Sequence, residues 1–163
     1  MEEQYDSRQD TLDHIEKVFV FMNMIADFIK LRAFLHDQSK LEEPEKSIFD
    51  DITPKLKTLT YGSDEYKQSL VELGKTLEHH YAQNKHHPEH FSHGIEDMNL
   101  VDLLEMFCDW CAATMRHEDG NIIESIKINK KRFKYDEILA KIFTNTAIQL
   151  QMGKNCDDTK TIV

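Results

Sequence analysis

The chain has 163 residues and a formal net charge of −10, from 30 acidic and 20 basic residues. This length is typical of one domain with a hydrophobic core, and the acidic surface repels nucleic-acid backbones and anionic lipid. We therefore expect neither a nucleic-acid polymer nor a membrane as a partner. A polar N-terminus without a long apolar run predicts no signal peptide and no membrane span. Three cysteines, an odd number without framework spacing, favour reduced thiols and a cytoplasmic protein.

Apolar residues recur at helical spacing through most of the chain, and only five glycines and three prolines interrupt them. This pattern predicts an all-helical protein, a bundle of about six helices. The expected helices cover residues 10–35, about 44–54, 64–82, 99–116, 121–133 and 136–151. We expect a single domain over residues 1–152 and a flexible tail over residues 153–163.

The first predicted helix carries one apolar stripe, whose members recur every three or four residues. They are Ile15, Val18, Phe19, Met22, Ile25, Ala26 and Ile29. His36 and Asp37 follow at its C-terminal end. Adjacent imidazole and carboxylate groups can reach one metal ion where a helix ends, and together they favour Fe, Mn, Zn or Co over Ca.

Seven of the nine histidines lie between residues 79 and 117. His79 and His80 belong to the last turns of the predicted third helix, and only one of two helical neighbours is expected to face a site. Residues 83–98 form an irregular polar segment that contains Pro88 and Gly94. Loops on a rigid scaffold often carry binding residues.

Asp109 lies beside the apolar arc of the fourth predicted helix, next to Trp110 and two alanines. An unpaired buried carboxylate is costly, so Asp109 requires a partner. Two partners stay open, a cation such as Arg116 or a metal ion held jointly with His36 and Asp37. We expect Cys108 and Cys111, a lone CxxC pair within this helix, to be core-facing thiols.

The order of these residues resembles the HD-domain superfamily of metal-dependent phosphohydrolases. His36-Asp37-Gln38-Ser39-Lys40 is similar to its HDxGK motif, and residues 86–89 are similar to its HHE segment, with Pro88 at the position of Glu. The closest resemblance is to a family of small HD-like proteins of phages and bacteria, whose activity is not established. It rests on HDxSK, NKHHPE at 84–89, CDW at 108–110, and RH at 116–117 with GNI at 120–122.

The resemblance implies an HD-like helical bundle around a central metal site with one or two divalent transition-metal ions. It implies that His36, Asp37 and Asp109 are ligands and that His14 is the fourth. In a two-ion site Asp37 bridges, and one histidine of the pair 79/80 and one of 86/87 complete the second ion. We prefer His80 and His87.

These residue types support metal-assisted hydrolysis of a phosphate ester. We expect Lys40 to hold the substrate phosphate. Arg116 either holds it as well or forms an ordinary ion pair with a nearby carboxylate. We expect a small nucleotide as substrate, either a nucleoside monophosphate or a cyclic or signalling nucleotide. Four aromatic residues are candidates for base stacking, with a core role as the alternative: Tyr61, Tyr81, Phe91 and Trp110.

Two other functions stay open with the same residues. The first is an HD-fold di-iron oxygenase, which needs the same ligands. The second is a non-enzymatic phage protein that binds a nucleotide or a host partner. Apolar positions on the last helix either serve a homodimer or complete the core: Ile142, Phe143 and Ile148.

Overall fold

A computed structural model of the protein describes residues 5–56, 58–60, 63–65, 68, 71, 74–116 and 118–153. In these ranges the regular structure is helical and contains no strand, which confirms the predicted all-α class. The chain divides into two compact units, residues 1–36 and 37–163. The single domain over residues 1–152 stays a prediction, and residues 154–163 of the predicted tail lie outside the described residues.

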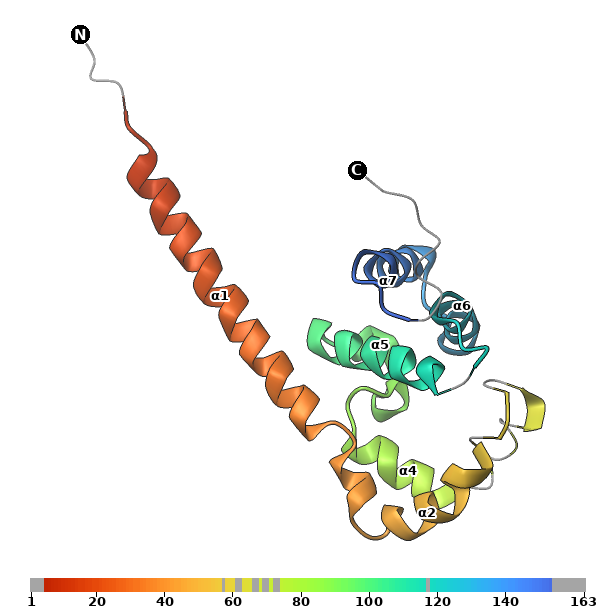
Figure 1. The fold of residues 1–163 in the computed structure, drawn as a ribbon. Coiled ribbons are helices and arrows are strands. Elements are labelled where there is room, and N and C mark those ends of the chain that lie inside the picture. The colour runs from red at the N-terminus through yellow and green to blue at the C-terminus, as the bar shows by residue number, and fades with distance from the viewer. Residues whose placement is uncertain are drawn as a thin grey trace. The chain divides into compact units, whose positions relative to one another are not determined.

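The first unit contains one long helix, α1, which spans Arg8–Leu35 (Figure 1). The predicted range of 10–35 agrees with it within two residues. No residue of α1 is buried, because a single helix offers no second surface within its own unit to cover its apolar stripe. No described helix of the protein is long and apolar enough to cross a membrane.

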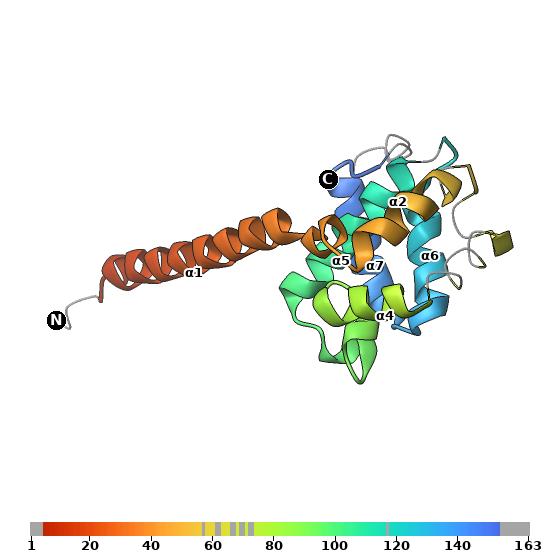
Figure 2. The ribbon, with the colours of Figure 1, turned by 90° about the horizontal axis from the view of Figure 1, so that it is seen from below.

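The second unit begins with a short 3-10 helix, η1 (Gln38–Leu41), followed by α2 (Glu45–Leu56) and α4 (Gly74–Gln83). These three elements contact one another, and both views place α2 beside α4 (Figures 1 and 2). Pro54 lies inside the last turn of α2, two residues before the helix ends. The third predicted helix, over residues 64–82, includes positions outside the described residues, among them Tyr66, Leu70 and Leu73.

The segment after α4 is irregular, as predicted, with two 3-10 turns, η2 (Pro88–His90) and η3 (Gly94–Asp97). Three helices follow: α5 (Leu100–Met115), α6 (Ile122–Phe133) and α7 (Glu137–Gln149). Each begins after a side chain that accepts hydrogen bonds from the first free N–H groups, namely Asn99, Asn121 and Asp136. All three predicted helices are therefore confirmed, with boundaries within two residues.

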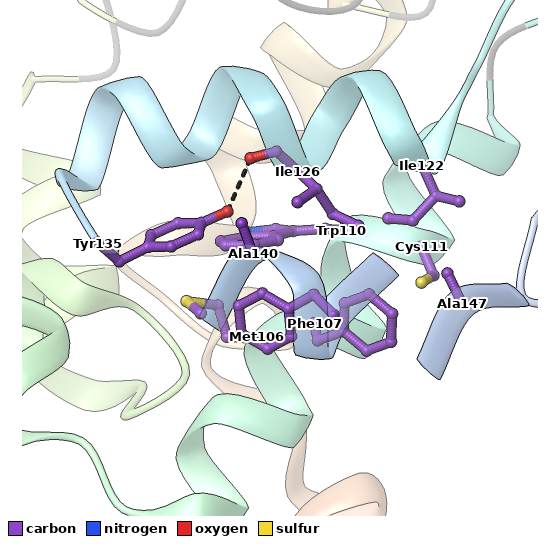
Figure 3. Packing of buried hydrophobic residues seen from close by; sticks show 10 residues of the cluster. Met106, Phe107, Trp110, Cys111, Ile122, Ile126, Tyr135, Ala140 and Ala147 are labelled. Atoms are coloured by element: carbon purple, nitrogen blue, oxygen red, sulfur yellow. Dashed lines mark hydrogen bonds between the residues drawn. The ribbon is translucent and has the colours of Figure 1, made fainter. Parts of the chain in front are cut away.

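The hydrophobic core of the second unit lies between α5, α6 and α7. Figure 3 shows Trp110 of α5 close to Ile126 of α6 and to Tyr135. The Tyr135 hydroxyl donates to the Ile126 carbonyl at 2.7 Å. Phe143 of α7 is buried and stacks on Phe107 with ring centroids 5.2 Å apart, so it completes the core. Of the two alternatives for this residue, the core role is confirmed, whereas Ile142 is exposed.

The connection from α5 to α6 requires a glycine. A Cβ atom on Gly120 would lie 1.7 Å from the Thr114 carbonyl oxygen, closer than any side chain tolerates. In α5 itself, Cys111 is buried in the core, but Cys108 is exposed. The prediction that both thiols face the core is therefore wrong for Cys108. Side chains three positions apart still differ in direction by about 60°, so Cys108 lies beyond the edge of the buried arc that contains Cys111.

Candidate metal centre

Asp37 begins the second unit with a left-handed backbone, at φ 55°, and precedes η1. Aspartate tolerates this conformation better than most residues, so the turn itself suits the residue type. The Asp37 Oδ1 atom lies 3.4 Å from Nε2 of His80 and 3.5 Å from Nε2 of His86. The turn after residue 36 therefore brings this carboxylate to two imidazoles.

Three histidines surround the Asp37 carboxylate. His80 comes from the last turn of α4, and His86 and His87 follow once the helix has ended. The Nε2 atoms of His80 and His87 face each other at 2.9 Å. His80 and His86 are each 1% exposed, and His87 is half-buried. One ligand atom from each histidine and one from Asp37 all lie within 4.8 Å of one another.

This donor set fits a transition-metal ion. Ligand atoms bound at ~2.0–2.2 Å from one ion lie roughly 3 Å apart, and three of the measured separations are 2.9, 3.4 and 3.5 Å. Three imidazoles and one carboxylate suit Zn, Fe, Mn or Co, not an oxygen-seeking ion such as Ca.

The buried carboxylate of Glu45, at the start of α2, orients two of the histidines. Its two oxygens accept hydrogen bonds from Nδ1 of His79 at 2.8 Å and Nδ1 of His80 at 2.9 Å. Ser39 donates to the same group at 3.0 Å. Because a carboxylate only accepts, Nδ1 of His80 carries the hydrogen and its Nε2 lone pair faces the cluster.

A second glutamate lies close to His86. Nδ1 of His86 lies 3.1 Å from Oε1 of Glu105, on α5, while Nε2 of the same ring faces Asp37. Two of the three imidazoles therefore have a carboxylate on the side away from the cluster. In protein metal sites a hydrogen-bonded carboxylate at this place fixes ring orientation and tautomer, as Glu45 does for His80.

Burial controls the charge of these groups. Burial lowers the pKa of His80, and the Lys40 ammonium lowers it further, against the opposing effects of Asp37 and Glu45. Burial also lowers the pKa of His87, with smaller contributions from His86 and His80. Both imidazoles are therefore neutral at neutral pH, which is the form that binds metal ions.

The pKa of the Glu45 carboxyl is lowered, which keeps the group ionised. Burial by itself raises this pKa, but the hydrogen bonds from His79, His80 and Ser39 outweigh burial and hold it below its ordinary value. A fully buried side chain, 0% exposed, thus keeps a negative charge behind the neutral imidazole of His80.

A cavity of about 620 Å³ opens beside the cluster, lined by Asp37, His80 and His87 and by the predicted site residues Lys40, Asp109 and Arg116. Carboxylate oxygens of Asp37 and Asp109 lie within 4.8 Å of each other. Lys40 Nζ lies 2.6 Å from Asp37 Oδ2 and 4.8 Å from the centre of the Phe49 ring. Sequence reasoning placed these residues around one site, and the second unit brings them to one cavity.

The other predicted site residues have different positions. His14 and His36 belong to the first unit, and their part in the site stays a prediction. Both His86 and His87 join the cluster, whereas the sequence led us to expect one of the pair. Three other histidines lie outside the cluster: His79 contacts the Glu45 carboxylate, His90 the Tyr81 carbonyl, and His93 the Asp97 carboxylate.

The four aromatic residues that were candidates for base stacking differ in where they lie. Tyr81 and Trp110 line the cavity, and Trp110 belongs to the core as well. Phe91 packs on His90 with ring centroids 4.8 Å apart, and Tyr61 lies outside the described residues.

Residues 3–154 match a family of unknown function, DUF5662. The chain belongs to this family. No curated protein and no solved structure matches it. The family description names no activity, so the function of this DUF5662 chain has to be argued from its site.

Four residues of the site escaped sequence reasoning: Glu45, Glu105, Asn84 and Arg132. Glu105 precedes Asp109 by four residues, which places both on one face of α5, and this spacing was a usable signal. No comparable signal distinguishes Glu45 from the other acidic residues of the chain. Asn84 donates to the His80 carbonyl at 2.8 Å, a local contact, and to Ser39 Oγ at 2.9 Å, a contact across 45 positions that only the fold creates.

Proposed function

We propose that the protein is a metal-dependent phosphohydrolase that acts on a small phosphorylated molecule of the nucleotide class. One observation carries the proposal: the cavity wall that contains Asp37, His80 and His87 also contains Lys40, Arg116 and Arg132. A metal-type cluster and three cationic side chains thus share one cavity. The resemblance to the HD-domain phosphohydrolases supports the same function.

A bound metal ion would make the cavity favourable for an anionic substrate. Its wall holds three cations beside three carboxylates, Asp37, Asp50 and Asp109, so a bound dication would leave it net positive. Its volume of about 620 Å³ is within the range of ~300–1,000 Å³ that small-molecule sites occupy. Aromatic side chains in the same wall, Tyr81 and Trp110, offer apolar faces for a base.

The chain's own residues have distinct parts in the proposed reaction. Asp37, His80, His86 and His87 would hold the ion, which when bound supplies Lewis acidity and a more acidic water. Lys40 offsets negative charge on the phosphoryl oxygens, as does Arg116. Asp109, whose carboxylate lies within 4.8 Å of that of Asp37, is a further ligand in the proposal.

The experiment is metal analysis of protein purified without chelator, followed by a phosphatase assay on mono-, di-, tri- and cyclic nucleotides. Asp37→Asn retains a residue that tolerates the left-handed backbone but removes the charge. We expect Asp37→Asn and His87→Ala to lose both metal and activity. His93→Ala, an exposed histidine outside the cluster, is the matched control and should keep both.

Two results would overturn the proposal. Fully metallated wild-type protein that is inert on every nucleotide class would exclude the hydrolase. Full metal content in Asp37→Asn together with His87→Ala would exclude the assigned cluster.

A further inference from the structure

Arg132, on α6, points to a second anion position in the cavity. We propose that Arg132 binds a second phosphate group of the substrate, one step away from the group at the metal cluster. The substrate then carries two linked phosphates, as a nucleoside diphosphate does. This inference rests on the proposed function for the phosphate chemistry of the cavity.

The residues that hold Arg132 adjoin the cluster in the sequence. Its Nη2 atom donates to Glu89 Oε1 at 2.6 Å and lies 3.5 Å from the Tyr81 hydroxyl. Tyr81 directly follows His80, and Glu89 comes two residues after His87. The two segments that supply imidazoles to the cluster therefore also fix the direction of this guanidinium.

The cations of the cavity differ in their distance from the cluster. Lys40 contacts it directly, with Nζ 2.6 Å from Asp37 Oδ2. Arg132 contacts the hydroxyl end of Tyr81, whose ring centroid lies 4.8 Å from that of His87. Among the described contacts, Arg132 is thus linked to the cluster through the Tyr81 ring, whereas Lys40 contacts it directly. Two cations placed in this way suit two linked phosphates better than a single phosphate.

The guanidinium retains donors for a ligand. Within the described part of the chain, its two polar contacts both involve Nη2, and its carbon lies 4.6 Å from the centre of the Phe133 ring. Arginine has five N–H donors in a rigid planar fork, so the Nε and Nη1 edge can bind phosphate oxygens. Stacking on Phe133 and the Glu89 ion pair hold that edge in place.

The test compares binding of AMP with that of methylene-bridged ADP, which resists cleavage between its phosphates, by calorimetric titration. Titrations use metal-loaded wild type and the Asp37→Asn background, each with and without Arg132→Ala. We expect the ADP analogue to bind wild type more tightly than AMP does. Arg132→Ala should weaken the ADP analogue by about 10- to 100-fold, with little change for AMP.

Two further variants make the result specific. Arg132→Lys keeps the charge but loses the fork, so most of the preference for the ADP analogue should disappear while AMP binding stays. If Arg132→Ala fails to fold, Arg132→Lys alone decides the test. Lys131→Ala removes a neighbouring exposed cation of α6 and should keep the wild-type preference.

Equal binding of AMP and the ADP analogue by wild type would overturn the inference. So would an equal loss of both ligands in Arg132→Ala and Arg132→Lys. Hydrolysis tests the proposed function separately from binding. The proposed function is wrong if metal-loaded protein hydrolyses no nucleotide. A selective loss of the ADP analogue in the Asp37→Asn background still supports Arg132 as the second anion site.

Discussion

Glu45 shows how one buried residue can determine what its neighbours do. Its carboxylate accepts from His79, His80 and Ser39 and has no exposed surface. A buried charge with fewer partners would be costly, so these contacts are needed for stability as well as for orientation. Because these contacts keep the hydrogen of His80 on Nδ1, the lone pair of its Nε2 atom faces Asp37.

Glu45→Gln should therefore weaken metal binding without removing a ligand. Glutamine keeps the size but loses the charge that favours the Nδ1–H tautomer of His80. We expect metal affinity to fall by ~10- to 100-fold, measured by competition of zinc or cobalt against a chromophoric chelator. The ¹⁵N chemical shifts of the His80 ring report the tautomer directly.

Glu78→Gln, on the exposed face of α4, is the matched control and should bind metal as the wild type does. Wild-type affinity in Glu45→Gln, with an unchanged His80 tautomer, would show that the glutamate does not position the ring.

At the scale of elements, Tyr135 joins α6 to α7. Its ring packs on Trp110 and Phe143, and its hydroxyl donates to the Ile126 carbonyl at 2.7 Å. Burial raises the pKa of this phenol above its ordinary value of about 10. Ionising Tyr135 in the folded protein thus places a charge in the core.

This contact makes the packing of α6 on α7 sensitive to alkali. Because the folded pKa lies above the unfolded one, the stabilisation is fully present below pH ~10 and is lost as the pH rises from there toward the folded pKa. Tyr135→Phe should cost about 1 kcal/mol at neutral pH through the lost hydrogen bond. The difference from wild type should shrink above pH ~10, as measured by urea unfolding at each pH. A constant difference from neutral pH into the alkaline range would contradict this account.

At the scale of the whole molecule, the candidate metal cluster draws its residues from separate parts of the second unit. Asp37 precedes η1, His80 ends α4, and His86 and His87 lie in the following irregular segment. An ion held by all four would link these segments only in the folded chain, because the unfolded chain does not hold them together.

Metal should therefore raise the thermal stability of the protein. Free metal at 100 times its dissociation constant adds about 2.7 kcal/mol, and each kcal/mol shifts Tm by ~2–4 °C at this size. We expect a chelator to lower Tm by roughly 5–10 °C in circular dichroism melts. The double variant Asp37→Asn and His87→Ala should not respond, and an equal response of both proteins would place the stabilising ion elsewhere.

The helices follow from the sequence because their causes are local. Periodic apolar residues define the buried face of α5, and Asn99, Asn121 and Asp136 satisfy the first N–H groups of the helices that they precede. The His-Asp doublet and the histidines of residues 79–87 likewise predict a metal-type cluster, because the sequence states directly which side chains can act as ligands.

Tertiary structure alone determined which of these groups meet and what stands behind them. His86 and His87 both lie near Asp37 because the chain turns after Asn84, where the His87 N–H donates to the Asn84 carbonyl, and spacing along a chain does not reveal such a turn. Glu45 reaches His80 across 35 positions, and Arg132 reaches Glu89 across 43. Local propensity acts over a few residues, whereas these pairings depend on how packed helices bring distant segments together.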